Sequence, residues 1–225
     1  MRGRRNAQHK QPFLIVALSA TVALLAFGVA LSLAPKGARL ALPTATPGGI
    51  AVGRYQDVLD TPFVNQDGQR MTLTDLRGRP VVMFFGYTFC PDVCPLGMSD
   101  LRRIKRGLGE RGEEVAFVFV SMDPDRDTPE VLRRYVKTFD PAFIGLTTKD
   151  VAALQRFVYA FDGLFEKQPP ESDNPNVYTV AHTSFTYLLD RDGRWVMKYP
   201  FGTPYAVILA DVQRLLGAPT SAAQP

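Results

Sequence analysis

The sequence predicts an α/β fold, a mixed β-sheet with helices on both faces. Residues 80–88 and 114–122 are almost continuous apolar runs, as expected of strands buried on both faces. Segments with helical spacing follow each run, so strands and helices alternate along the chain. A hairpin signal lies at each end of this alternation and adds antiparallel strands to a parallel centre.

The first half of the domain contains a hairpin, two strands and a helix. Apolar runs flank Asp67-Gly68 and predict a hairpin over residues 62–73. The strand over 80–88 leads into a predicted helix over 96–111 and then into the strand over 114–122. The helix rests on apolar residues near helical spacing, namely Leu96, Met98, Leu101, Ile104 and Leu108.

The second half of the domain begins with a well-marked helix over residues 128–139. Thr128 is its predicted N-cap and Pro129 its first residue. A short strand over 142–146 and a helix over 150–161 should follow. Asp150 is the predicted cap of this helix. A hairpin is predicted over residues 184–200, around Asp192-Gly193, and a last helix over residues 204–217.

The chain divides into five parts by composition. Residues 1–12 form a basic tail, 13–34 an uncharged apolar run, 35–53 a linker rich in Pro, Gly, Ala and Thr, 54–218 the α/β domain, and 219–225 a short tail. A helix over the apolar run would span the hydrocarbon core of about 30 Å. A cleaved signal peptide is the alternative, but its apolar region is usually only about 7–15 residues long.

The charges indicate topology and exclude one class of function. Before residue 41 there are six cations and no acid, whereas the rest of the chain has 20 cations and 22 acids. The basic tail before the apolar run should remain in the cytoplasm. We therefore expect a single-pass protein of a bacterial inner membrane, with its C-terminal domain in the periplasm. The domain has no excess of positive charge with which to bind nucleic acid.

Cys90 and Cys94 are the only two cysteines, and they stand where a predicted strand runs into a predicted helix. A structural disulfide is one interpretation, but it would close a loop of only a few residues and stabilise little. If Pro95 lies near the first helical position, Cys94 lies near the N-cap, where unpaired N–H groups lower the pKa of a thiol. The pair therefore predicts redox chemistry or metal binding.

A metal site needs a third ligand, because two sulfurs alone rarely complete one. Thiolates suit Cu(I) and also bind zinc. The chain has two histidines, and His9 lies in the basic tail. His182 stands just before a predicted strand that should lie beside the cysteine strand. A lone histidine in such a place is often structural, but an imidazole here would complete a site for Cu(I) or Cu(II).

Three motifs together resemble the Sco/SenC family of membrane-anchored copper chaperones: "FGYTFCPDVCP", "VSMDPDRDTPE" and "AHTSFTYLLDRDG". The likeness runs from about residue 55 to 217 and includes the apolar run. It implies a thioredoxin-like fold and one copper ion held by Cys90, Cys94 and His182. It also implies a chaperone rather than an enzyme, which assembles the dinuclear copper centre of cytochrome c oxidase subunit II and meets other copper-handling proteins. Many relatives have His where this chain has Phe89, so no fourth ligand is expected there.

The same two cysteines also fit a thiol-disulfide oxidoreductase or a peroxiredoxin-like enzyme. Thioredoxin-type enzymes generally have C-x-x-C and a proline facing it, whereas this chain has C-x-x-x-C and no proline in "VYTVAHTSFTY". These departures favour copper, although the two roles are compatible. Asp123, at the end of the second buried strand, is a candidate for orienting a ligand or tuning the thiols. Asp127 and Glu130 are explained by the start of the helix.

Overall fold

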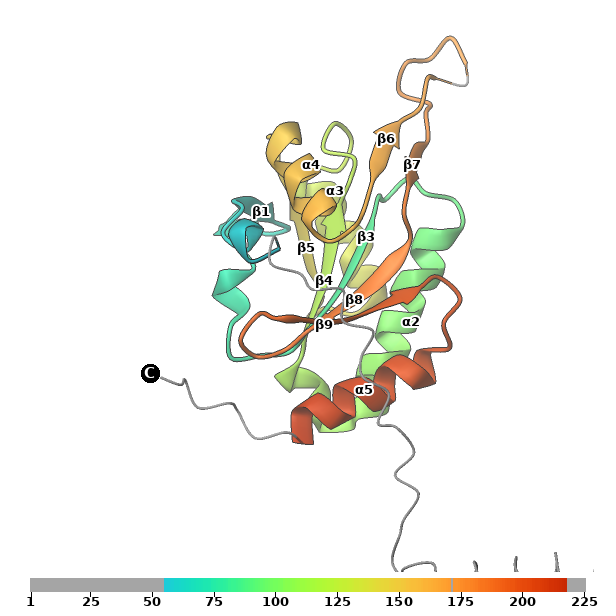
Figure 1. Ribbon diagram of the computed structural model, residues 1–225. Helices are drawn as coiled ribbons and strands as arrows, with labels where there is room; N and C mark the ends of the chain where they lie inside the picture. The colour runs from blue at the N-terminus through green and yellow to red at the C-terminus, as the bar shows by residue number, and fades with distance from the viewer. Residues whose placement is uncertain (1–54, 171, 218–225) are drawn as a thin grey trace, which may run out of the picture. The chain divides into compact units, whose positions relative to one another are not determined.

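The computed structural model describes residues 55–170 and 172–217 of the chain (Figure 1). The predicted basic tail, membrane anchor and linker and the C-terminal tail all lie outside these residues. Within the described part, no helix is both long and apolar enough to cross a membrane.

A seven-stranded mixed sheet forms the centre, in the order β2-β1-β5-β4-β3-β8-β9. Its strands are β1 (Phe63–Asn65), β2 (Arg70–Met71), β3 (Val81–Gly86), β4 (Ala116–Ser121), β5 (Ile144–Thr147), β8 (Phe185–Leu189) and β9 (Trp195–Pro200). Strands β3, β4 and β5 are parallel, while β1 and β8 add antiparallel to β5 and β3. Every residue of β3 and β4 is buried, which confirms the prediction from the two apolar runs.

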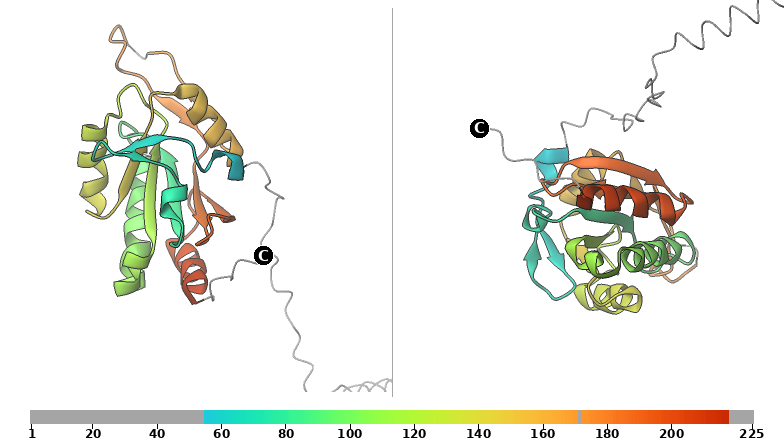
Figure 2. Two further views of the ribbon diagram at one scale, coloured as in Figure 1. Left: turned by 90° about the vertical axis from the view of Figure 1, so that its left-hand side faces the viewer. Right: turned by 90° about the horizontal axis from the view of Figure 1, so that it is seen from below.

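Helices cover both faces of the sheet, as predicted. They are α2 (Val93–Leu108), α3 (Pro129–Phe139), α4 (Val151–Ala160) and α5 (Tyr205–Gly217), with short 3-10 turns η1 (Tyr55–Val58), η2 (Thr74–Leu76) and η3 (Gly109–Glu114). Neighbouring residues of β3 separate the two faces. Phe84 packs toward Phe119 and α2, whereas Phe85 packs against Phe157 of α4. Helix α5 lies beside α2 (Figure 2).

The local signals of the sequence reappear as capping and turn interactions. The Thr128 hydroxyl accepts a hydrogen bond from the N–H of Val131 at the start of α3, and Asp150 caps α4 in the same way. The predicted hairpins form, and Gly68 and Gly193 occupy turn positions with φ of 80° and 79°. The arrangement is an α/β sandwich consistent with a thioredoxin-like fold.

Two features differ from the predictions. Helix α2 begins at Val93, before Pro95, so the proline lies in the first turn, where its missing N–H costs no helical hydrogen bond. A second, two-stranded sheet pairs β6 (Phe165–Lys167) with β7 (Val180–His182), and the sequence did not indicate it. His182 therefore ends β7 rather than standing in the loop before β8.

Candidate metal centre

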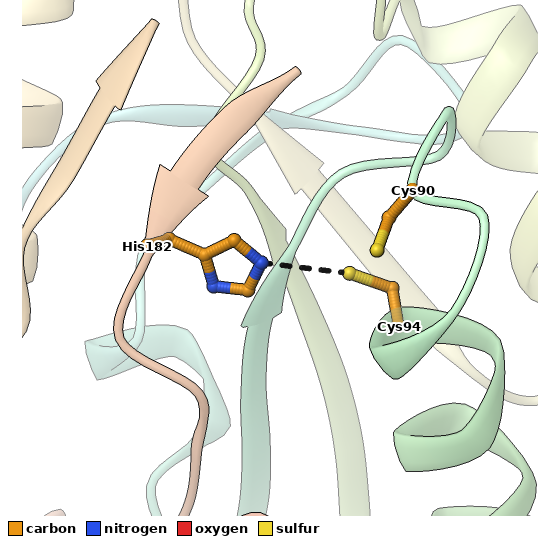
Figure 3. Close-up of side chains that lie close together, drawn as sticks. All are labelled: Cys90, Cys94 and His182. Atoms are coloured by element: carbon orange, nitrogen blue, oxygen red, sulfur yellow. Dashed lines mark hydrogen bonds between the residues drawn. The ribbon is translucent and has the colours of Figure 1, made fainter. Parts of the chain in front are cut away.

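Cys90 lies on the connection between β3 and α2 and Cys94 in the first turn of α2, at the carboxyl end of a central parallel strand. The N–H of Cys90 donates to the Tyr87 carbonyl over 3.3 Å and closes the turn that follows β3. Cys94 is the second residue of α2 and is fully buried, while Cys90 is 9% exposed. Both are free thiols. Their sulfur atoms face one another across the loop (Figure 3).

Asp127 holds this cysteine loop from the far side. Its carboxylate accepts hydrogen bonds from the backbone N–H of Thr88 at 3.0 Å, from the Thr88 hydroxyl at 2.6 Å and from the Ser121 hydroxyl at 2.5 Å. Burial raises the pKa of Asp127, and the hydrogen bonds oppose that shift. The sequence assigned Asp127 to the start of α3, but Thr128 is the cap and Asp127 positions the turn before Cys90.

His182 reaches the same point from β7. Its Nδ1 lies 3.0 Å from the carbonyl oxygen of Thr183, which can only accept a hydrogen bond, so Nδ1 carries the proton. Nε2 is then an unprotonated acceptor, 3.7 Å from the Cys94 sulfur (Figure 3). The ring packs edge-on against Tyr87, with centroids 5.8 Å apart. Burial lowers the pKa of His182 and keeps the imidazole neutral, as a metal ligand must be.

Cys90, Cys94 and His182 can each present one ligand atom within 4.8 Å of the others. Among residues 55–170 and 172–217, this is the one group of three or more His, Cys, Asp or Glu side chains so placed. Two soft sulfurs and one imidazole nitrogen suit copper, and they could also bind zinc. Phe89 supplies no ligand: it is 56% exposed and lies over the guanidinium of Arg126.

The buried position of Cys94 reverses one expectation from the sequence. A thiol at a helix N-terminus should have a lowered pKa. Instead, loss of solvent contact raises the pKa of Cys94 well above its usual range, although the backbone N–H of Tyr87 partly opposes this. In the copper-free protein this sulfur therefore carries its proton at neutral pH and shares it with Nε2 of His182.

This protonation predicts a pH-dependent copper affinity. A thiol must lose its proton to bind copper, so Cys94 alone should make the affinity rise about tenfold per pH unit between pH 6.5 and 8.5. Burial lowers the pKa of His182 and favours its neutral form, so the imidazole should add little to this slope. Competition with a chelator at several pH values would measure the dependence, and Cys94→Ser should reduce its slope. An affinity independent of pH would mean that Cys94 is already a thiolate without metal.

Gly86, the last residue of β3, determines how closely Cys94 approaches the sheet. A Cβ at Gly86 would lie 2.8 Å from the Cys94 sulfur and 2.9 Å from the Phe119 ring, both too close for a real contact. The sulfur therefore occupies the space that a side chain at position 86 would fill. The sequence signal was a glycine inside an apolar strand, which often marks a close approach.

Gly86→Ala should displace the Cys94 sulfur and weaken copper binding about tenfold or more, since a ligand would move and not merely its support. Gly145→Ala is the matched control, because Gly145 lies on β5 and an added methyl there crowds Leu132 and Val136 of α3, away from the cysteines. Both changes should cost about 1–3 kcal/mol of stability through overpacking. Titration with copper and thermal unfolding separate the two effects. Equal copper affinities in the two variants would contradict this role for Gly86.

Asp123, which the sequence made a candidate for orienting a ligand or tuning the thiols, is buried just after β4. Its carboxylate accepts from Arg126 Nε at 2.5 Å and from the Tyr178 hydroxyl at 2.7 Å. Tyr178 lies four residues before His182 on the segment that enters β7. Asp123 thus connects to the segment that carries the histidine, rather than to a sulfur. Arg126, its partner, was not singled out in the sequence.

The comparisons with known proteins agree on one group. The family model described as SCO1/SenC matches residues 55–217. The SCO2-like protein RP587 of Rickettsia prowazekii is 36% identical over 154 residues, which cover 64% of this chain and 72% of the relative. The structure of Bradyrhizobium japonicum ScoI with copper bound has a TM-score of 0.62 and 34% identity, and covers 68% of this chain and 96% of that one.

A second similar structure is BsSco, described as having a disulfide switch and as a member of the Sco family of cytochrome c oxidase assembly proteins. It has a TM-score of 0.56 and 27% identity, and the match covers 68% of this chain and 90% of that one.

Proposed function

Because the chain belongs to the SCO1/SenC family, we propose that it is a copper metallochaperone. It binds one copper ion through Cys90, Cys94 and His182 and delivers it to the dinuclear copper centre of cytochrome c oxidase subunit II. The observation that carries this proposal is the placement of two thiol sulfurs and one imidazole nitrogen within 4.8 Å of one another. The similar ScoI structure with copper bound supports the choice of metal.

The surroundings of the three side chains suit a transferable ion. The sulfurs lie in a largely apolar site, which favours the soft, singly charged Cu(I) paired with thiolates over a hard cation. The neutral imidazole presents Nε2 toward Cys94, so no proton must leave the ring before it binds. No carboxylate belongs to the ligand group in the described residues. Copper is the cargo in this function, and the chain binds it and then releases it.

The test is X-ray absorption and metal analysis of the full-length chain in detergent. The reduced chain should bind one copper, with two sulfurs and one nitrogen in its shell. The chain oxidised to a Cys90–Cys94 disulfide should bind far less, because thiolates are the ligands. A reduced chain that binds no copper, or binds it without sulfur, would refute the proposal.

A second candidate function is thiol-disulfide exchange with a partner protein. The observation that favours it is the proximity of the two free thiols, together with the disulfide switch described for BsSco. In that reaction Cys90 and Cys94 would lose two electrons and two protons and form a disulfide, while the disulfide of the partner would gain them and become two thiols. His182 would then be dispensable, and this distinguishes the two functions.

The proposed location is a bacterial inner membrane, with residues 13–34 as the anchor and the copper-binding domain in the periplasm. It rests on the uncharged apolar run and the basic residues before it. An enzyme reporter that works only outside the cytoplasm, fused after Pro225, should be active. Activity from a cytoplasm-specific reporter alone would refute this topology.

A further inference from the structure

The ligands come from two segments that are far apart in the sequence, and one loop contacts both of them. This loop comprises residues 122–128 and connects β4 to α3. Asp127 bonds to Thr88, two residues before Cys90, at two points. Arg126, the residue before it, bonds to the segment that leads to His182. Neighbouring residues of one loop therefore hold the two sides of the metal centre.

Arg126 makes a fixed set of contacts on the histidine side. Its Nη1 donates to the backbone carbonyls of Asn176 at 3.1 Å and Tyr178 at 2.9 Å. Its Nε donates to Asp123, and its guanidinium carbon lies 3.5 Å from the centre of the Tyr178 ring. The planar guanidinium can hold a carboxylate, two carbonyls and a ring at once, which a lysine cannot do in the same geometry.

These contacts are made in a buried position. The Arg126 side chain is only 10% exposed, and Asp123 is 2% exposed. Nη2 of Arg126 is also buried, and it has no hydrogen-bond partner in the described part of the chain. An unpaired buried donor is costly, so burying this arginine is a poor way merely to stabilise the fold. An exposed ion pair, Lys167 with Asp125, already connects the same loop to the neighbouring strand β6 at the surface.

We propose that Arg126 is a positioning residue for His182. By holding the carbonyls of Asn176 and Tyr178, it fixes the start of β7 and thereby the distance of the imidazole from Cys90 and Cys94. This rests on the proposed copper site. Residues that orient metal ligands typically affect metal affinity about 10–100-fold, and we expect an effect of this size.

The experiment is a double-mutant cycle on the reduced full-length chain in detergent, with Cu(I) affinity measured by chelator competition. Arg126→Met should lower the affinity about 10–100-fold. In a His182→Ala background it should lower it no further, because its effect passes through the imidazole. Asp127→Asn acts on the cysteine side and should weaken binding in both backgrounds. An equal loss from Arg126→Met with and without His182 would overturn the proposal.

Arg133→Met is the matched control. Arg133 also pairs with an aspartate, Asp67, and donates to a backbone carbonyl, that of Gln66, but it does so at the β1–β2 hairpin. Its removal should leave copper affinity unchanged. If Arg126→Met fails to fold because Asp123 is left buried and charged, Arg126→Met with Asp123→Asn removes that charge and should show the same dependence on His182.

A copper-free measurement separates failure of this proposal from failure of the copper function. Hydrogen exchange of the backbone amides of 176–182 should quicken in Arg126→Met, while exchange at 88–94 stays unchanged; Asp127→Asn should do the reverse. Unchanged exchange at 176–182 would overturn the positioning role even if copper binds. Wild-type protein that binds no copper would refute the copper function, and the exchange result would still decide whether Arg126 fixes β7.

Discussion

Changing Cys90 and Cys94 together to serine is expected to abolish measurable Cu(I) binding by the chain. Serine hydroxyls are hard, neutral ligands that match Cu(I) poorly, so both strong donors are lost. If each loss costs at least the roughly 10–100-fold seen for supporting residues, the two together cost at least about 100–10,000-fold. The fold should survive, because serine is close to cysteine in size and a hydroxyl at position 94 can donate to Nε2 of His182.

The control for this variant is Met98→Leu. Met98 is one turn further along α2, is fully buried and carries the next sulfur in the chain. A volume-conserving change there should leave copper affinity as it was. Isothermal titration of the reduced proteins, with circular dichroism to verify folding, makes the comparison. If the double serine variant binds copper with unchanged affinity, the metal site lies elsewhere on the chain.

His182→Ala should weaken copper binding by at least about 10–100-fold, the loss typical of residues that only support a ligand. Cu(II) should suffer more than Cu(I), because two thiolates can hold Cu(I) in a linear arrangement while Cu(II) requires nitrogen donors. The fold should remain, since His182 is at the end of a short strand and is only partly buried. Cells that carry this variant should lose oxidase activity, and added copper should restore part of it.

The control here is His9→Ala, which removes the only other histidine of the chain. It should change neither the affinity for copper nor the oxidase activity. Affinity for both copper states and electron paramagnetic resonance of the Cu(II) form give the measurement. A folded His182→Ala protein with normal affinities and normal oxidase activity would end the three-ligand description and favour thiol exchange.

The sheet and most helices could be predicted because their signals are local. The apolar runs of β3 and β4 indicate burial on both faces, and Thr128 and Asp150 mark the starts of two helices. The β6–β7 sheet could not be predicted in this way. Its strands have three residues each and pair across a polar segment that contains Pro169-Pro170, so neither strand shows a period of its own.

The three side chains that the structure brings together could be predicted because few candidates exist: two cysteines and one histidine outside the basic tail. The roles of the groups around these three side chains could not be predicted. The raised pKa of Cys94 depends on burial from all sides, which the helix position alone does not reveal. The role of Gly86 depends on how closely α2 approaches β3. The two backbone carbonyls that Arg126 holds lie 50 and 52 residues away in the chain, and only the folded structure brings them to it.

Under the proposed function, the separate β6–β7 sheet has a consequence for how copper leaves the protein. A two-stranded sheet has fewer ladder hydrogen bonds than a seven-stranded one, so it should open at a lower free energy than the central sheet. The imidazole belongs to this weaker unit, while Cys90 belongs to the connection after β3 and Cys94 to the first turn of α2. A bound ion would therefore lose its nitrogen first and stay on the two sulfurs. A receiving protein could then supply a ligand at the vacated position, and the ion would pass between proteins without ever being free in solution.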